Sequence, residues 1–215
     1  MRKNIFEHIY KRSGVIWTRT EPPKRLVTLV ESRKINPCKT IDIGCGEGFY
    51  SIYLASRGFD VTGIDLSEKA IKYAKKNAVN HGVNVRFLSM DIDDLGKLDE
   101  KFDFVFEWSL LHLINPSRRP NYVEYVKNLL NNGGKYLSMC FNEPNLYLDG
   151  FEKIYRGIIL GIKLYFSGIK VYYSSQNELR ELFEPHFHTI ESKLIPVPGE
   201  RGPSFIGNYF FMEKN

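Results

Sequence analysis

The chain has 215 residues, of which 43% are hydrophobic and 14% aromatic, and this is enough to bury one sizeable core. No apolar run approaches the roughly 18 residues that a membrane span needs, and the N-terminus lacks the apolar stretch of a secretory signal, so we expect a cytoplasmic protein. The cysteines, Cys38, Cys45 and Cys140, are odd in number and lack metal-ligand spacing. The sequence therefore indicates neither a disulfide framework nor a zinc site.

The net charge of +5 is concentrated at the start of the chain. Residues 1–34 contain nine Lys or Arg against three Glu, a balance of +6, which leaves −1 for the remainder. A basic arm of this kind contacts phosphates in some proteins, yet it is more often a solvated helix face. Charge alone therefore does not identify a partner.

Strand-like and helix-like segments alternate from Lys39 onward, which is typical of a parallel sheet with helices on both faces. Ahead of them, residues 22–35 predict an amphipathic helix with two prolines in its first turn. Within the alternating part we expect strands at 39–44, 59–65, 83–91, 101–108 and 134–141, and helices at 48–58, 67–82 and 119–134. The pattern predicts a doubly wound, mainly parallel seven-stranded α/β sheet of the Rossmann-like type.

The alternation breaks after Phe141, where residues 142–173 are aromatic and interrupted by glycines. We interpret this stretch as an insertion that contains a helix and covers the strand ends. A helix at 175–185 and an antiparallel strand pair at 187–198 and 207–215 complete the sheet. The expected organisation is one domain with four parts: an N-terminal helical lid (1–38), a core (39–141), the insertion (142–173) and a C-terminal part (174–215).

The stretch "TIDIGCGEGFYS" places a glycine-rich turn directly behind the first predicted strand. Such a turn lets the backbone approach a ligand closely, and two ligand classes compete for it. A dinucleotide fits poorly, because the third glycine, Gly48, comes one place early for GxGxxG, and because Asp42 would repel a pyrophosphate. A cationic ligand would instead be attracted by Asp42.

The segment "DIGCGEG" resembles the first motif of the class I methyltransferases that depend on S-adenosylmethionine. The resemblance covers about residues 39–141 and implies that acids at three successive strand ends hold the cofactor. Asp42 would face its cationic end, Asp65 would accept the ribose hydroxyls, and Asp91 would take the adenine amino group beside Ile92. The implied product is S-adenosylhomocysteine, and the implied cofactor-binding residues are Trp17, Asp42, Gly44, Cys45, Gly46, Gly48, Asp65, Leu66, Asp91, Ile92 and Glu107.

Two side chains after the fourth predicted strand are candidate catalytic groups. Glu107 ends that strand, next to the place where methyl transfer occurs in such folds, although an acid there can also cap a helix. His112 follows an apolar run and could act as a general base, although a lone histidine in that setting is more often structural. Trp17 belongs to the lid, but large aromatic residues normally fill a core.

The range of possible methyl acceptors is limited mainly by sequence motifs that the chain lacks. The fourth strand lacks the Asn/Asp-Pro-Pro-aromatic motif of enzymes that methylate planar amino nitrogens, and no Pro-Cys pair suggests cytosine C5 chemistry. Residues 14–31 and 102–141 are similar to the branch that includes thiopurine, thiol and halide methyltransferases. We therefore expect a small-molecule acceptor, with a thiol or another soft nucleophile favoured. An RNA methyltransferase that uses the basic leader and a non-catalytic cofactor-binding protein are the alternatives.

Overall fold

The computed structural model describes residues 2–11, 13–15, 17–143, 168–199 and 202–215. By its internal contacts the chain divides into two compact units, Met1–Phe106 with Asn128–Gly134, and Glu107–Lys127 with Lys135–Asn215. We call them unit 1 and unit 2 and describe each by itself. The predicted single-domain organisation stays a prediction, and most of the insertion, 144–167, lies outside the described residues.

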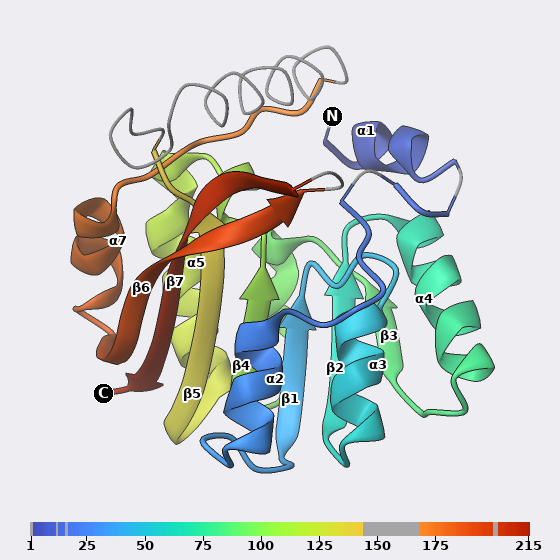
Figure 1. Cartoon of the computed structure of the whole chain (residues 1–215), viewed down its shortest axis with the longest axis horizontal. Helices are drawn as coiled ribbons and strands as arrows, with labels where there is room; N and C mark the ends of the chain where they lie inside the picture. The colour runs from blue at the N-terminus through green and yellow to red at the C-terminus, as the bar shows by residue number, and fades with distance from the viewer. Residues whose placement is uncertain (1, 12, 16, 144–167, 200–201) are drawn as a thin grey trace. The chain divides into compact units, whose positions relative to one another are not determined.

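Among the described residues, seven strands form one mixed sheet in the order β3-β2-β1-β4-β5-β7-β6 (Figure 1). β1 pairs in parallel with β2 and β4, β2 pairs in parallel with β3, and β7 is antiparallel to both β5 and β6. This confirms the predicted fold class, including the antiparallel last strand. The strands are β1 Lys39–Ile43, β2 Asp60–Asp65, β3 Arg86–Ser89, β4 Phe102–Trp108, β5 Leu130–Phe141, β6 Phe187–Gly199 and β7 Gly202–Lys214.

In unit 1, two helices follow the first two strands and pack against the sheet. α3 (Phe49–Ser56) contacts β2, and α4 (Glu68–Asn80) contacts β2, β3 and α3. α4 begins where predicted, because the Ser67 side chain accepts a hydrogen bond from the Ala70 amide and caps the first turn. Because β1, β2 and β3 are parallel, the loops that follow them lie at the same, carboxyl edge of the sheet.

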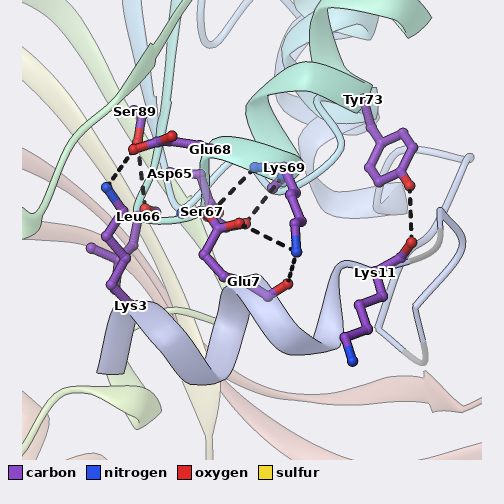
Figure 2. A network of polar contacts seen from close by, with 11 residues as sticks. Lys3, Glu7, Lys11, Asp65, Leu66, Ser67, Glu68, Lys69, Tyr73 and Ser89 are labelled. Atoms are coloured by element: carbon purple, nitrogen blue, oxygen red, sulfur yellow. Dashed lines mark hydrogen bonds and ion pairs between the residues drawn. The ribbon is translucent and has the colours of Figure 1, made fainter. Parts of the chain in front are cut away.

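The first helix of unit 1, α1 (Arg2–Ile9), lies across the start of α4 (Figure 2). Lys3 forms an ion pair with Glu68 at 2.6 Å, and Lys69 donates to the Glu7 carbonyl at 2.8 Å. The predicted helix at 22–35 is α2 (Lys24–Glu31), which buries Leu26 and Leu29. Both helices fall in the segment predicted as a helical lid.

Unit 2 contains the end of β4, the helix α5 (Arg119–Leu129) except its last two residues, α7 (Gln176–Phe183), and the long β6–β7 hairpin drawn in orange and red in Figure 1. Its core is aromatic. The Tyr136 ring meets Phe183 and Phe187 at centroid distances of 5.8 and 5.4 Å, and Phe183 also packs on Phe210. α7 starts with a capping box, in which Ser175 and Glu178 satisfy each other's backbone amides.

Three predicted boundaries in the second half of the chain are wrong. The helix predicted over 119–134 ends at Leu129, and β5 begins at Leu130 rather than at Gly134. Two asparagines and two glycines follow Leu130, and Gly133 takes a positive φ of 70°, so these residues do not sustain a helix. β7 starts at Gly202 and so takes in residues predicted as the turn.

Candidate cofactor and active site

The glycine turn after β1 needs its glycines for conformation and for space. Gly44, Gly46 and Gly48 have φ values of 78°, 55° and 80°, in the left-handed region that side chains disfavour. A Cβ on Gly48 would lie 2.6 Å from the Phe87 ring. The turn is fixed to β2, because the amides of Gly44 and Cys45 both donate to the Ile64 carbonyl.

Asp42 lies in β1, two residues before this turn, and is 2% exposed. Its carboxylate accepts a 2.6 Å hydrogen bond from the Ser51 hydroxyl of α3. Burial raises its pKa to about 7, against the opposing effect of the Ser51 hydrogen bond, and the nearby Asp65 charge raises it further. Asp42 is therefore a buried acid whose ionised form would be stabilised by a cation.

Asp65 ends β2 and joins two loops. Its two carboxylate oxygens accept hydrogen bonds from the amides of Gly46 and Ser67, each at 2.9 Å. Burial raises its pKa to about 6, although the two amide donors act in the opposite direction. Each carboxylate oxygen has two lone pairs, so both retain acceptor capacity toward a ligand.

The third predicted acid, Asp91, follows β3 and caps the 3₁₀ helix Ile92–Lys97 by accepting from the Asp93 amide. The Met90 amide donates to the Asp65 carbonyl at 2.9 Å, so the loops after β2 and β3 are joined. Asp91 and Ile92 are half-buried, and so is Leu66. Apart from Trp17, the predicted cofactor residues of unit 1 thus lie in the ends of β1 and β2 or in the loops that follow β1, β2 and β3.

Glu47, inside the glycine turn, holds the N-terminal segment against it. This acid is 3% exposed. Its carboxylate accepts from the Ser13 hydroxyl at 2.5 Å, the Gly14 amide at 2.7 Å and the Thr18 hydroxyl at 2.8 Å. Trp17, in the same segment, is half-buried and donates its indole N–H to the Tyr10 hydroxyl at 2.9 Å. We call the three Glu47 hydrogen bonds the Glu47 latch.

In unit 2, Glu107 is fully buried and extensively hydrogen-bonded. Its carboxylate accepts from the amides of Leu110 and Leu111 and from the Ser138 hydroxyl. Burial raises its pKa to about 7, and these hydrogen bonds oppose the rise. The bonds shape the loop after β4, in which Ser109 takes a strained φ of 70°.

His112 is 4% exposed and stacks on the Phe141 ring at a centroid distance of 3.9 Å. Its Nδ1 has no hydrogen-bond partner among the described residues. Burial lowers its pKa to about 3, and the positive charge of Arg119 lowers it further. The imidazole is therefore neutral at physiological pH.

Arg119 fastens the loop that leads into α7. Its guanidinium donates to the Ile114 carbonyl, the Ser174 hydroxyl and the Tyr172 carbonyl. The Tyr172 amide in turn donates to the His112 carbonyl at 2.8 Å. The chain on the far side of the insertion is thus attached to the loop that carries His112.

The glycine turn has Asp42 in β1, Asp65 at the end of β2 and Asp91 shortly after β3, an arrangement typical of Rossmann-like proteins that bind nucleoside-containing ligands. Comparison with known proteins specifies the class. Residues 41–134 match the methyltransferase domain family. The match covers less than half of the chain, and it agrees with the class I, Rossmann-like methyltransferases that the sequence resembles. The narrower branch of thiopurine, thiol and halide enzymes stays a prediction.

Three similar proteins illustrate the match. The probable S-adenosyl-L-methionine-dependent methyltransferase TehB of Haemophilus influenzae is 32% identical over 107 residues, 49% of this chain and 37% of the relative. The ubiquinone biosynthesis O-methyltransferase of Coxiella burnetii is 32% identical over 121 residues, 56% of this chain and 50% of the relative. The chain thus spans half or less of the length of these curated relatives.

The fold comparison agrees. The crystal structure of Burkholderia thailandensis 1,6-didemethyltoxoflavin-N1-methyltransferase, with bound 1,6-didemethyltoxoflavin and S-adenosylhomocysteine, superposes with a TM-score of 0.74 at 20% identity, covering 100% of this chain and 87% of that one. At this identity the likeness shows the fold. None of the described helices is long and apolar enough to cross a membrane.

Sequence reasoning missed two residues of this region, Glu47 and Tyr10. Glu47 could have been noticed as an acid between two glycines, but its partners are about 30 residues earlier in the chain. Tyr10 carries no motif, and only the fold shows that its hydroxyl lies against Gly46, where an added Cβ would be 3.0 Å away.

Proposed function

We propose that this protein is an enzyme that binds S-adenosylmethionine in unit 1 and transfers its methyl group to a small-molecule acceptor. The observation that carries the proposal is a pair of acids, the buried Asp42 and the half-buried Asp65, beside a glycine turn fixed in left-handed conformations. The methyltransferase domain match at residues 41–134 agrees with it.

The residues present fit this cofactor. Burial disfavours the charged forms of Asp42 and Asp65, and the nearby charges of Asp65 and Glu7, respectively, add to this effect; a ligand with a sulfonium and an ammonium group would relieve that cost. A pyrophosphate would increase it. In the proposed arrangement Asp42 attracts the cationic end, Asp65 accepts from the ribose hydroxyls, and Asp91 accepts from the adenine amino group beside Ile92.

When bound, the cofactor supplies an electrophilic methyl carbon for in-line displacement. The protein then contributes orientation and exclusion of water rather than covalent chemistry. The glycine turn lets the backbone approach the cofactor closely. The Glu47 latch holds the 13–18 segment against that turn. Trp17 belongs to the same segment.

For the acceptor, we favour a thiol or another soft nucleophile. His112, with a pKa of about 3, is a weak base at neutral pH, and the Glu107 carboxylate, although its pKa is about 7, already accepts three hydrogen bonds. A thiol with a pKa near 8.5 needs little help from a base. The named relatives, a ubiquinone O-methyltransferase and a toxoflavin N1-methyltransferase, support the coarser class of small-molecule acceptors.

The cofactor proposal is tested by calorimetry with S-adenosylhomocysteine. Asp65→Ala should weaken binding by about 30- to 150-fold, because two hydrogen bonds to a carboxylate are lost. Asp60→Ala, at the exposed start of the same strand, is the matched control and should bind like wild type. Unchanged affinity in Asp65→Ala, together with binding of NADH by the wild type, would show that the ligand class is wrong.

The acceptor is tested by a methyl-transfer screen with labelled cofactor against thiols, halides, phenols, amines and bulk tRNA. We expect a small acceptor to be methylated, and His112→Ala to retain most activity toward thiols. Methylation of tRNA alone would favour the alternative of an RNA methyltransferase that uses the basic N-terminal segment. Tight cofactor binding with no turnover of any acceptor would favour a non-catalytic binding protein.

A further inference from the structure

Tyr10 is buried against the glycine turn although it comes from the N-terminal segment. The residue is 3% exposed. A Cβ added to Gly46 would meet the Tyr10 hydroxyl at 3.0 Å, so this oxygen lies directly on the turn. Trp17 fixes its orientation by donating its indole N–H to the oxygen and by an edge-on contact between the rings at 6.0 Å.

The Tyr10 O–H proton has no acceptor among the described residues. The only side-chain hydrogen bond that the structure gives this hydroxyl is the one it accepts from Trp17. Its neighbours in the segment are engaged, since the hydroxyls of Ser13 and Thr18 both donate to Glu47. A buried donor without an acceptor is rare and costly, which points to a partner other than the described residues.

The electrostatic surroundings keep this donor protonated. Burial raises the pKa of Tyr10 well above its ordinary value, and the negative charges of Asp65 and Glu47 raise it further. The acids around the turn, Asp42, Glu47 and Asp65, can only accept hydrogen bonds when they are ionised. A ligand group that can only accept hydrogen bonds needs a hydrogen-bond donor, and the Tyr10 hydroxyl is one.

We propose that Tyr10 is a cofactor-binding residue that donates its hydroxyl proton to the carboxylate of S-adenosylmethionine, with Trp17 as the residue that positions it. This rests on the proposed function. The carboxylate is the only anionic group of that cofactor, and a hydrogen bond to a charged acceptor is the strongest use of a neutral donor. Trp17 thereby acts through Tyr10.

The test compares S-adenosylmethionine with decarboxylated S-adenosylmethionine, which lacks only the carboxylate. Tyr10→Phe keeps the ring and removes the donor. Its affinity for S-adenosylmethionine should fall by roughly 10- to 100-fold, as expected for a hydrogen bond to a charged group. Its affinity for the decarboxylated compound should equal that of the wild type. Calorimetry measures both, and thermal unfolding checks that the variant is folded.

Trp17→Phe provides the second variant. It should weaken binding of S-adenosylmethionine, leave the decarboxylated compound unaffected, and add nothing in a Tyr10→Phe background, because it acts through the same hydroxyl. Equal losses for both compounds in Tyr10→Phe, or no loss for either, would overturn the assignment. A wild-type protein that binds neither compound would instead overturn the proposed function itself.

Discussion

At the scale of single residues, Gly48 combines two constraints that can be separated by substitution. Its φ of 80° strains any side chain, and a Cβ would also collide with Phe87 and Ala74. Gly82 has a φ of 65° but nothing within 4 Å of an added Cβ. Gly48→Ala should therefore cost about 1–3 kcal/mol more than Gly82→Ala, the cost of overpacking. Urea unfolding measures the difference, and equal losses would contradict the geometry.

Asp42 and Asp65 predict how cofactor affinity depends on pH. Their pKa values of about 7 and 6 lie above the ordinary 3.8, so both are partly protonated in mildly acidic solution. A cationic ligand favours the ionised forms, so binding releases protons. Affinity should rise between pH 5.5 and 7.5, by up to about tenfold per pH unit for each coupled proton, and then level off.

Titration calorimetry in two buffers of different ionisation enthalpy measures this proton release. Uncharged methylthioadenosine is the control and should show a weaker dependence. Affinity for S-adenosylmethionine that does not change with pH would contradict the prediction. Without ligand the sign for stability is opposite: a raised carboxyl pKa in the folded state contributes stability that falls as pH rises from the unfolded pKa through the folded one.

At the scale of elements, the N-terminal segment is held by two kinds of contact. Lys3 and Glu68 form an exposed ion pair, which solvent screens strongly. The Glu47 latch consists of three hydrogen bonds to a buried carboxylate. Glu47→Ala should therefore release the segment and speed tryptic cleavage after Arg19 by more than about tenfold, which corresponds to 1.4 kcal/mol of local opening.

Glu68→Ala is the matched control, because it removes only the exposed ion pair. It should change the cleavage rate after Arg19 by less than about fivefold, in keeping with the weakness of surface pairs. Mass spectrometry of the fragments over time measures both rates. Equal acceleration by the two variants would mean that the Glu47 latch does not hold the segment.

The helices and strands that were predicted well from the sequence are those whose bounds are determined by residues within or next to them. α4 carries its own serine cap and its own apolar face, and β1 and β2 carry the acids that marked the motif at or next to their last residues. β5 was misplaced because nothing local marks where pairing replaces the helix. The Glu47 latch and the Tyr10 hydroxyl were missed because both depend on contacts between segments distant in the chain.

At the scale of the whole molecule, cofactor binding should raise thermal stability by mass action. S-adenosylhomocysteine at 100 times its dissociation constant adds about 2.7 kcal/mol. For a chain of this length that corresponds to roughly 5–10 °C in Tm. Asp65→Ala at the same ligand concentration should gain less than about 1 kcal/mol, because its weaker affinity leaves the site near half saturation.

Differential scanning calorimetry with and without ligand measures these shifts. The ligand-free Tm of each protein serves as its own reference, so any intrinsic destabilisation by Asp65→Ala is subtracted. The same ligand-induced rise in both proteins would show that S-adenosylhomocysteine binds away from the strand-end acids.

Hydrogen exchange at one amide of the Glu47 latch can measure how fast the N-terminal segment opens. The Gly14 amide proton is bonded to a buried carboxylate, so it exchanges with solvent only when the segment separates from the glycine turn. If cofactor exchange requires the same separation, the opening rate read from Gly14 deuteration sets an upper limit on the turnover number. One backbone proton would then show whether chemistry or product departure governs the enzyme's speed.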